Sequence, residues 1–334
     1  KNKTRKQYTK CRMATESNHL IQRNLAIENP LVYLHKAISP EAAVLGGSAA
    51  IFFLVVRPNF LVIDDSKAPN SWTPPLNQPF PYGKQPVRGV NLGGWLVLEP
   101  FITPSLFNAS GVIDEYTLCA SLGPDAAKET LGNHYSTFIT EQDFADIAQA
   151  GLDHVRIPFG HWAISTTADE PYVPKLSWDY LLKGIEWARK YGLRVLAELH
   201  TAPGSQNGWN HSGRQGNVNW LLGPNGTANA DRTLSIIQEA ISSLNSLNYQ
   251  HVVSLISPLN EPRVELVGLN VLQEWYQKAY DVIQNVTAKG PLQPWILYSD
   301  GMAGLSAWKG FMKGYKNVAL DTHQYLIFDP NLMK

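Results

Sequence analysis

The stretch that decides the fold is VVSLISPLNEPR, residues 252–263. Its first five residues form an apolar run typical of a buried parallel strand, and the remainder has the composition of a loop. In α/β barrels the chemistry lies at the carboxyl ends of such strands, so this position favours Asn260 and Glu261 as functional residues. Pro262 restricts the preceding residue, and we therefore expect extended geometry at Glu261. Taken alone, Asn-Glu-Pro also fits an ordinary strand-end loop.

Short apolar runs alternate along the chain with longer segments whose apolar residues recur three and four positions apart. This alternation predicts parallel strands joined by helical crossovers. The predicted strands are residues 89–92, 154–157, 194–199, 252–256, 295–298 and 318–322, and the predicted helices are 141–150, 178–191, 232–247 and 272–286. A (β/α)₈ TIM barrel needs two strands more than these. We expect a barrel whose last strands lie beyond residue 334, or else an open sheet with an exposed edge.

Five motifs occur in a recognisable order along the predicted strands and helices. They are RGVNLGGWLVLEP (88–100), HVRIP (154–158), ELHTAPGSQNG (198–208), NEP (260–262) and HQY (323–325). With these motifs the chain resembles the fungal exo-β-1,3-glucanases of glycoside hydrolase family 5. The resemblance runs from about Arg88 to the last residue, and it implies a (β/α)₈ barrel that releases glucose from the non-reducing end of β-1,3-glucan.

Retaining hydrolysis of a glycoside requires two carboxyl groups about 5 to 5.5 Å apart, an acid/base and a nucleophile. The resemblance implies that Glu261 is the acid/base and that Asn260 binds the sugar 2-hydroxyl. It also implies a nucleophilic Glu on a seventh strand and a Trp below the sugar on an eighth strand. Both would lie beyond residue 334, so we expect no nucleophile within this sequence.

Arg156 lies in an otherwise apolar strand, where a buried guanidinium requires a partner. The family pairs this Arg with the nucleophile, so we expect Arg156 to lack its partner here. His200 and His323 resemble histidines that orient the substrate or the carboxylates, and Tyr325 resembles a phenol that donates to the nucleophile. Each of these three, considered singly, also fits a core or loop side chain.

Other positions resemble the family's sugar-binding residues. Glu99 matches the residue that binds hydroxyls of the terminal glucose. Trp209 and Phe328 match an aromatic pair at the mouth of the pocket, although the family more often has Phe at the first of these. Glu198 stands where the common fungal form has Asp. It shares strand parity with His200 and should point to the same end of the barrel, but we do not assign it as the nucleophile.

Composition limits the classes of protein that this chain can be. It has 334 residues, 44% of them apolar, and zero formal net charge, which excludes a disordered or nucleic-acid-binding class. The sequence has no HExxH and no clustered ligand spacing, so we expect neither a metal nor another cofactor. The expected partner is a β-glucan, and the sequence leaves the oligomeric state open.

The amino-terminal region divides into three segments. Residues 1–41 carry eight Lys or Arg against three Glu, which predicts a basic disordered arm. Residues 42–63 are mainly apolar, and the basic flank is typical of a signal-anchor, although the uncharged run 42–56 is shorter than the roughly 20 residues of a full span. A buried or interfacial segment is the alternative. Residues 64–87 contain six prolines and predict a linker before the domain at 88–334.

Four acceptor triplets for N-glycosylation favour passage through the secretory pathway. They begin at Asn108, Asn210, Asn225 and Asn285. Together with the anchor they predict a single-pass protein of the cell membrane with an extracellular domain, or alternatively a protein secreted to the cell wall. The two cysteines, Cys11 and Cys119, would lie on opposite sides of the membrane, so we predict no disulfide.

Two other functions remain open from the sequence. A related β-1,6- or β-1,4-glucanase would use the same residues on another linkage. A glucan-binding module without catalysis would explain the missing carboxylate. If the leading hypothesis holds, residues 88–334 alone should hydrolyse laminarin negligibly, whereas a chain extended by two strands should release glucose with retained β configuration.

Overall fold

The computed structural model describes residues 63–325, all of which belong to one compact unit, Leu61–Lys334. The predicted basic arm, the apolar run 42–56, Cys11 and Phe328 lie outside the described residues. No helix within the described part combines the length and apolarity that crossing a membrane requires.

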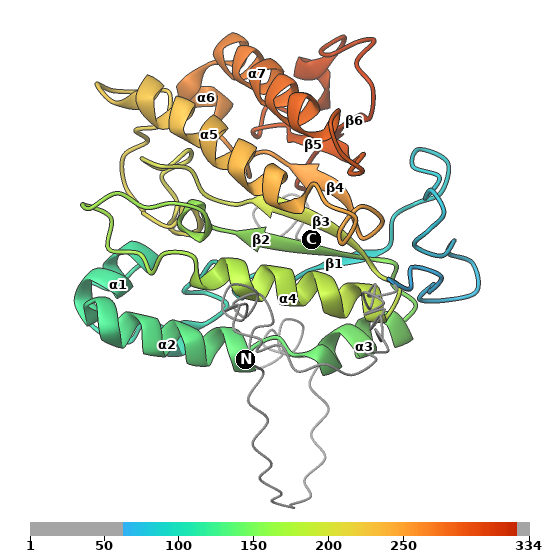
Figure 1. Cartoon of the computed structure of the whole chain (residues 1–334). Coiled ribbons are helices and arrows are strands. Elements are labelled where there is room, and N and C mark those ends of the chain that lie inside the picture. Colours follow the sequence, from blue (N-terminus) through green and yellow to red (C-terminus); the bar gives the residue numbers. More distant parts are fainter. Residues whose placement is uncertain (1–62, 326–334) are drawn as a thin grey trace, which may run out of the picture. The chain divides into compact units, whose positions relative to one another are not determined.

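One parallel sheet organises the described residues (Figure 1). Its strands are β1 (Gly89–Asn91), β2 (His154–Phe159), β3 (Arg194–Leu199), β4 (Val253–Ser257), β5 (Trp295–Ser299) and β6 (Val318–Asp321). They pair in sequence order, each with the next, as successive β-α-β units do. The predicted strands are therefore confirmed, and they form a curled portion of a (β/α)₈ barrel.

Helices connect the strands and cover the outer face of the sheet. They are α1 (Glu115–Leu122), α2 (Pro124–Thr137), α3 (Glu141–Gln149), α4 (Leu176–Lys190), α5 (Gly226–Leu244), α6 (Val264–Val267) and α7 (Leu269–Thr287). Helix α4 packs on β2 and β3, and α5 packs along α7, as Figure 1 shows. The four predicted helices are present. The sequence did not predict α1 and α2, which begin at an Asp114 cap and at Pro124.

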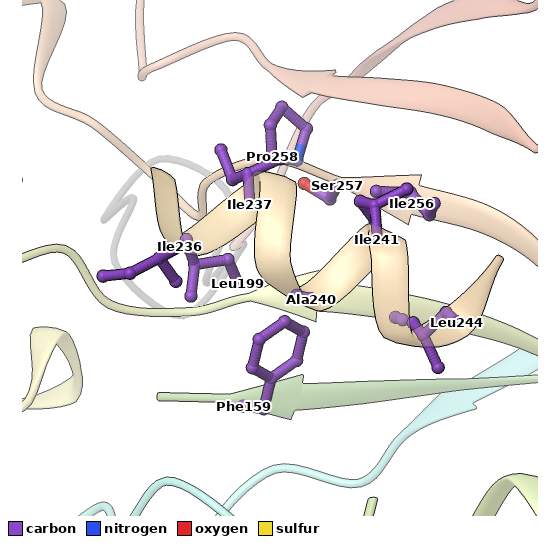
Figure 2. Close-up of a pocket in the computed structure, with 11 residues that line it drawn as sticks. Phe159, Leu199, Ile236, Ile237, Ala240, Ile241, Leu244, Ile256, Ser257 and Pro258 are labelled. Carbon is purple, nitrogen blue, oxygen red and sulfur yellow. The ribbon is translucent and has the colours of Figure 1, made fainter. Parts of the chain in front are cut away.

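The core lies between the sheet and these helices, and α5 illustrates its packing (Figure 2). One face of α5 presents Ile236, Ile237, Ala240, Ile241 and Leu244 to Phe159, Leu199 and Ile256 on three neighbouring strands. All of these side chains are buried. Burying an Ile or Leu contributes about 1.5–3 kcal/mol, so this face fixes the helix on β3 and β4. The carboxyl ends of the two strands lie side by side, because Glu198 of β3 is paired with Ser257 of β4.

Residues 64–87, predicted to be a linker, instead pack against the amino ends of the strands. Leu76 and Phe80 are buried, and the buried Arg194 of β3 donates to three backbone carbonyls of residues 74–78 at 2.9–3.0 Å. The buried guanidinium therefore has its polar partners in this segment. The prolines break regular secondary structure here, but they do not prevent packing.

Further polar contacts bind this segment to the barrel. Asp65 pairs with Arg189 at 2.9 Å and with His251 at 2.7 Å. The Tyr82 hydroxyl lies 2.8 Å from His154 Nε2 and 2.7 Å from Ser254 Oγ. The folded domain therefore includes residues before Arg88, and this segment closes the end of the sheet opposite Glu261.

Candidate active site

Asn260 and Glu261 are buried directly after β4, at the carboxyl end of the sheet. The backbone N–H of Asn260 donates to the backbone carbonyl of Leu199 at 3.0 Å. The Gln206 side chain donates to the carbonyl of Asn260 at 2.9 Å, and the Asn207 side chain donates to that of Glu261 at 3.2 Å. Both side-chain amides belong to the motif at 198–208, but we predicted no role for them from the sequence. They hold the turn that presents Glu261.

The backbone of Glu261 differs from the expectation of extended geometry. Its φ is +44°, in the left-handed region, which a non-glycine residue adopts at a cost. The Asn207 contact and the hydrogen bonds on both sides of the turn outweigh the preference that Pro262 imposes. Such a backbone aims the carboxyl in a direction that an extended turn would not give.

Arg156 has other polar partners within the described residues, and the expectation that it lacks the family's nucleophilic partner stays a prediction. Its guanidinium pairs with Glu198 Oε1 and donates to Asn260 Oδ1 at 2.7 Å and to Asn91 Oδ1 at 3.1 Å. Strand register allows the pairing, because Arg156 of β2 lies opposite Leu196 of β3, and Glu198 follows two residues later on the same face of the sheet. Arg156 thus links Asn260 to two neighbouring strands.

Glu198 and His200 lie side by side at the end of β3. His200 Nδ1 is 2.9 Å from Glu198 Oε2, and both side chains are buried. The two residues point to the same end of the sheet, as their shared parity predicted. Since each Glu198 oxygen already has a partner, Glu198 acts as an anchor for Arg156 and His200.

His323 follows β6 and reaches Glu261. Its Nδ1 donates to Glu261 Oε1, and its Nε2 lies 3.3 Å from Asp321 Oδ2. Burial lowers the pKa of an imidazole, but the hydrogen bonds to Asp321 and Glu261 outweigh it and raise the pKa of His323 to about 10. His323 is therefore an imidazolium between two carboxylates.

His211 also lies at Glu261, and the sequence did not predict it. Its Nε2 is 3.3 Å from Glu261 Oε2, and its ring lies 5.4 Å from that of His200 and 5.5 Å from that of Trp209. Burial lowers the pKa of His211 to about 4, so the ring is neutral. Its place two residues after Trp209 was the only available signal.

The electrostatic environment of Glu261 follows from these contacts. Burial alone would raise its pKa, but the hydrogen bond from His323 and the positive charge of that imidazolium hold the pKa below its ordinary value. Glu99, half-buried after β1, is close enough to interact electrostatically with Glu261, and burial raises its pKa. Glu261 is therefore ionised in this arrangement.

The remaining predicted residues lie around this centre. Tyr325 is exposed, with its ring 6.4 Å from that of His323. Trp209 is half-buried, and the Arg263 guanidinium lies 5.4 Å above its ring. The structure thus brings together Glu99, Arg156, His200, Trp209, Asn260, Glu261, His323 and Tyr325. Within residues 63–325, no group of His, Cys, Asp and Glu side chains is arranged to hold a metal ion.

Comparisons with known proteins identify relatives of this chain. The chain is 51% identical over 271 residues to glucan 1,3-beta-glucosidase D of Emericella nidulans, and 49% identical over 271 residues to probable glucan 1,3-beta-glucosidase D of Aspergillus fumigatus. Each match covers 80% of this chain and 32% of the relative, so the chain spans about a third of the length of these relatives.

A solved structure and a family model also match this chain. The rutinosidase from Aspergillus niger superposes with a TM-score of 0.64 at 24% identity, over 72% of this chain and 69% of that chain, which shows a shared fold. The sequence model of Cellulase (glycosyl hydrolase family 5) matches residues 120–331. With most of its barrel matched in this way, the chain belongs to glycosyl hydrolase family 5.

Proposed function

We propose that this chain carries the acid/base half of an exo-acting, retaining glycoside hydrolase that releases glucose from the non-reducing end of β-1,3-glucan. The observation that carries the proposal is the Glu261 carboxyl, buried at the end of β4 with an imidazole at each oxygen. The names of the relatives in Emericella and Aspergillus support the β-1,3 linkage.

The chemistry requires Glu261 in two protonation states. As an acid, Glu261 gives its proton to the glycosidic oxygen while the bond from that oxygen to C1 breaks and a second carboxylate attacks C1. As a carboxylate, Glu261 then takes a proton from the water that attacks C1, which frees β-glucose. Asn260, held by Arg156 at 2.7 Å, is placed to bind the 2-hydroxyl beside the reacting carbon.

We propose that the second carboxylate comes from chain beyond the described residues. Near Glu261, Glu198 is bound to Arg156 and His200, and Asp321 is bound to His323. Glu99 remains for the hydroxyls of the terminal glucose. An added carboxylate would also raise the pKa of Glu261, because like charges disfavour each other's ionisation. That rise would let Glu261 hold a proton when substrate binds.

The sugar-binding residues that the resemblance implies support exo action. Glu99 interacts electrostatically with Glu261, the ring of Trp209 lies 5.5 Å from that of His211, and Phe328 would complete the aromatic pair. A pocket closed at the terminal glucose admits one sugar beyond the bond that breaks. A preference for β-1,6 or β-1,4 linkages, or glucan binding without hydrolysis, are the alternative outcomes of the experiment below.

The location is a separate proposal. We propose a single-pass cell-membrane protein with this domain outside the cell, anchored through residues 42–56, with secretion to the cell wall as the alternative. Asn108, Asn225 and Asn285 are exposed and could carry glycans, whereas Asn210 is half-buried beside Trp209. Carbonate extraction of cell membranes tests the anchor, since a peripheral protein would be released.

The activity is tested with the full-length protein on laminarin, on a β-1,6-glucan and on a β-1,4-glucan. We expect glucose from laminarin, with the β anomer appearing first in the proton NMR spectrum. Residues 63–334 alone should release negligible glucose. An α anomer first, or preference for another linkage, would refute the respective part of the proposal. Laminarin binding without turnover by the full-length protein would identify a binding module.

A further inference from the structure

We propose that His211 is a positioning residue for the acid/base: as a neutral imidazole it holds Glu261 Oε2 and fixes the plane of the carboxyl. The inference rests on the proposed function of Glu261. It starts from the 3.3 Å separation between His211 Nε2 and Glu261 Oε2. The two atoms are within contact distance without forming a well-aligned hydrogen bond, and catalytic contacts are often poorly aligned before substrate binds.

Several hydrogen bonds hold the loop that carries His211. Ser205 Oγ and Ser212 Oγ lie 2.6 Å apart, and the Trp209 amide donates to the Asn207 side chain at 2.9 Å. The Gln215 amide donates to the Asp114 carboxylate at 2.6 Å, which binds the far end of the loop to the cap of α1. These contacts hold the backbone on both sides of the ring and so set the position from which the imidazole reaches Glu261.

The two imidazoles at Glu261 differ in charge. His323 at Oε1 is cationic because two carboxylates flank it, and it favours only the ionised form of Glu261. His211 lies beside the buried ring of His200 and the half-buried ring of Trp209, and burial lowers the pKa of His211 to about 4. A neutral ring can donate to the carboxylate, and after a change of tautomer it can accept from the acid. His211 thus suits both protonation states.

Other titratable and charged groups also surround this pair. They are Glu99 after β1, Arg156 on β2, Glu198 and His200 on β3 and in the loop after it, and Asp321, His323 and Tyr325 on β6 and in the loop after it. Most are held by partners of their own, whereas His211 Nδ1 is buried without a hydrogen-bond partner among residues 63–325. Packing and Glu261 therefore orient the ring. A histidine with a purely structural role would instead be oriented by a polar partner at each ring nitrogen.

The contact itself can be tested by NMR without any activity. In protein with labelled histidines, the ¹⁵N shifts of His211 should report a neutral ring from pH 5 to 8. They should change in the Glu261→Gln variant. His211→Lys should lower the pKa of Glu261, measured by ¹³C NMR, by about one unit or more, because it adds a cation at Oε2. The inference would be overturned if His211 titrated near its ordinary pKa and its ¹⁵N shifts stayed unchanged in the Glu261→Gln variant.

The positioning role is tested by leaving-group dependence in the full-length enzyme. For His211→Ala we expect kcat/KM on laminaribiose to fall about 10–100-fold, because its poor leaving group needs a well-aimed proton. On 2,4-dinitrophenyl β-glucoside, which leaves without protonation, kcat/KM should fall less than about threefold. His211→Asn, which keeps a neutral donor, should recover most of the loss. His251→Asn, at the other end of the sheet, serves as the control.

The outcomes separate the two proposals. Equal losses on both substrates, or no loss on either, would refute the role of His211 while leaving the proposed function standing. If the wild-type enzyme hydrolyses no β-glucoside, the proposed function fails, and the NMR experiment still decides whether His211 holds Glu261.

Discussion

Replacing His323 by Gln should destabilise the protein in a pH-dependent way. Because its folded-state pKa is raised from about 6.5 to about 10, its contribution is fully present below pH 6.5 and is lost as pH rises through 10. At about 1.4 kcal/mol per pKa unit the ceiling is about 5 kcal/mol. Gln keeps one hydrogen bond, and Asp321 and Glu261 share the charge, so we expect His323→Gln to cost about 2–3 kcal/mol at pH 6.

Urea unfolding of wild type and His323→Gln at pH 6 and pH 10.5 measures this effect. The difference in unfolding free energy should fall below about 1 kcal/mol at pH 10.5, since the wild-type imidazole is then largely neutral. Gln324→Ala, at the exposed neighbouring residue, controls for general alkaline destabilisation. An equal cost of His323→Gln at both pH values, or none at pH 6, would refute the assignment of an imidazolium.

Arg156→Met should lower the free energy of unfolding by about 3 kcal/mol, because it leaves the buried Glu198 carboxylate without its cation. The double change with Glu198→Leu should recover part of that loss in thermal unfolding, and no recovery would mean that the pair is not coupled. Gly301→Ala should cost about 1–3 kcal/mol and reduce turnover, because its φ is +58° and the added Cβ would lie 2.6 Å from the Pro262 carbonyl. Gly304→Ala, at φ +75° in open space, is the matched control and should cost less.

Most of the sheet could be predicted from the sequence, because each strand is marked by a short apolar run in the local sequence. The third strand begins and ends where predicted, at Arg194–Leu199, and its residues are all buried. Asn260 and Glu261 were placed correctly because they follow an apolar run, and a parallel sheet brings all such strand ends to one edge. The order of the motifs then indicated the family, which the match to glycosyl hydrolase family 5 confirmed.

The remaining features depend on contacts between distant parts of the chain. The pairing of Arg156 with Glu198 follows from strand register, which local patterns do not specify. The left-handed backbone of Glu261 follows from the Asn207 contact, which overrides the preference imposed by the next residue. His211 has no periodicity or spacing that distinguishes it from a loop residue. The packing of residues 64–87 was not predicted, because their prolines usually indicate a linker.

The central claim, that Glu261 is the acid/base of a retaining glycosidase, is tested most directly by Glu261→Ala in the full-length enzyme. We expect activity on laminarin to fall about 10²–10⁴-fold, while kcat/KM on 2,4-dinitrophenyl β-glucoside stays within about tenfold of wild type. Azide should restore turnover of the aryl glucoside by replacing the base-activated water, and it should yield β-glucosyl azide. Unchanged activity on laminarin, or an equal loss on both substrates with no azide product, would contradict the account.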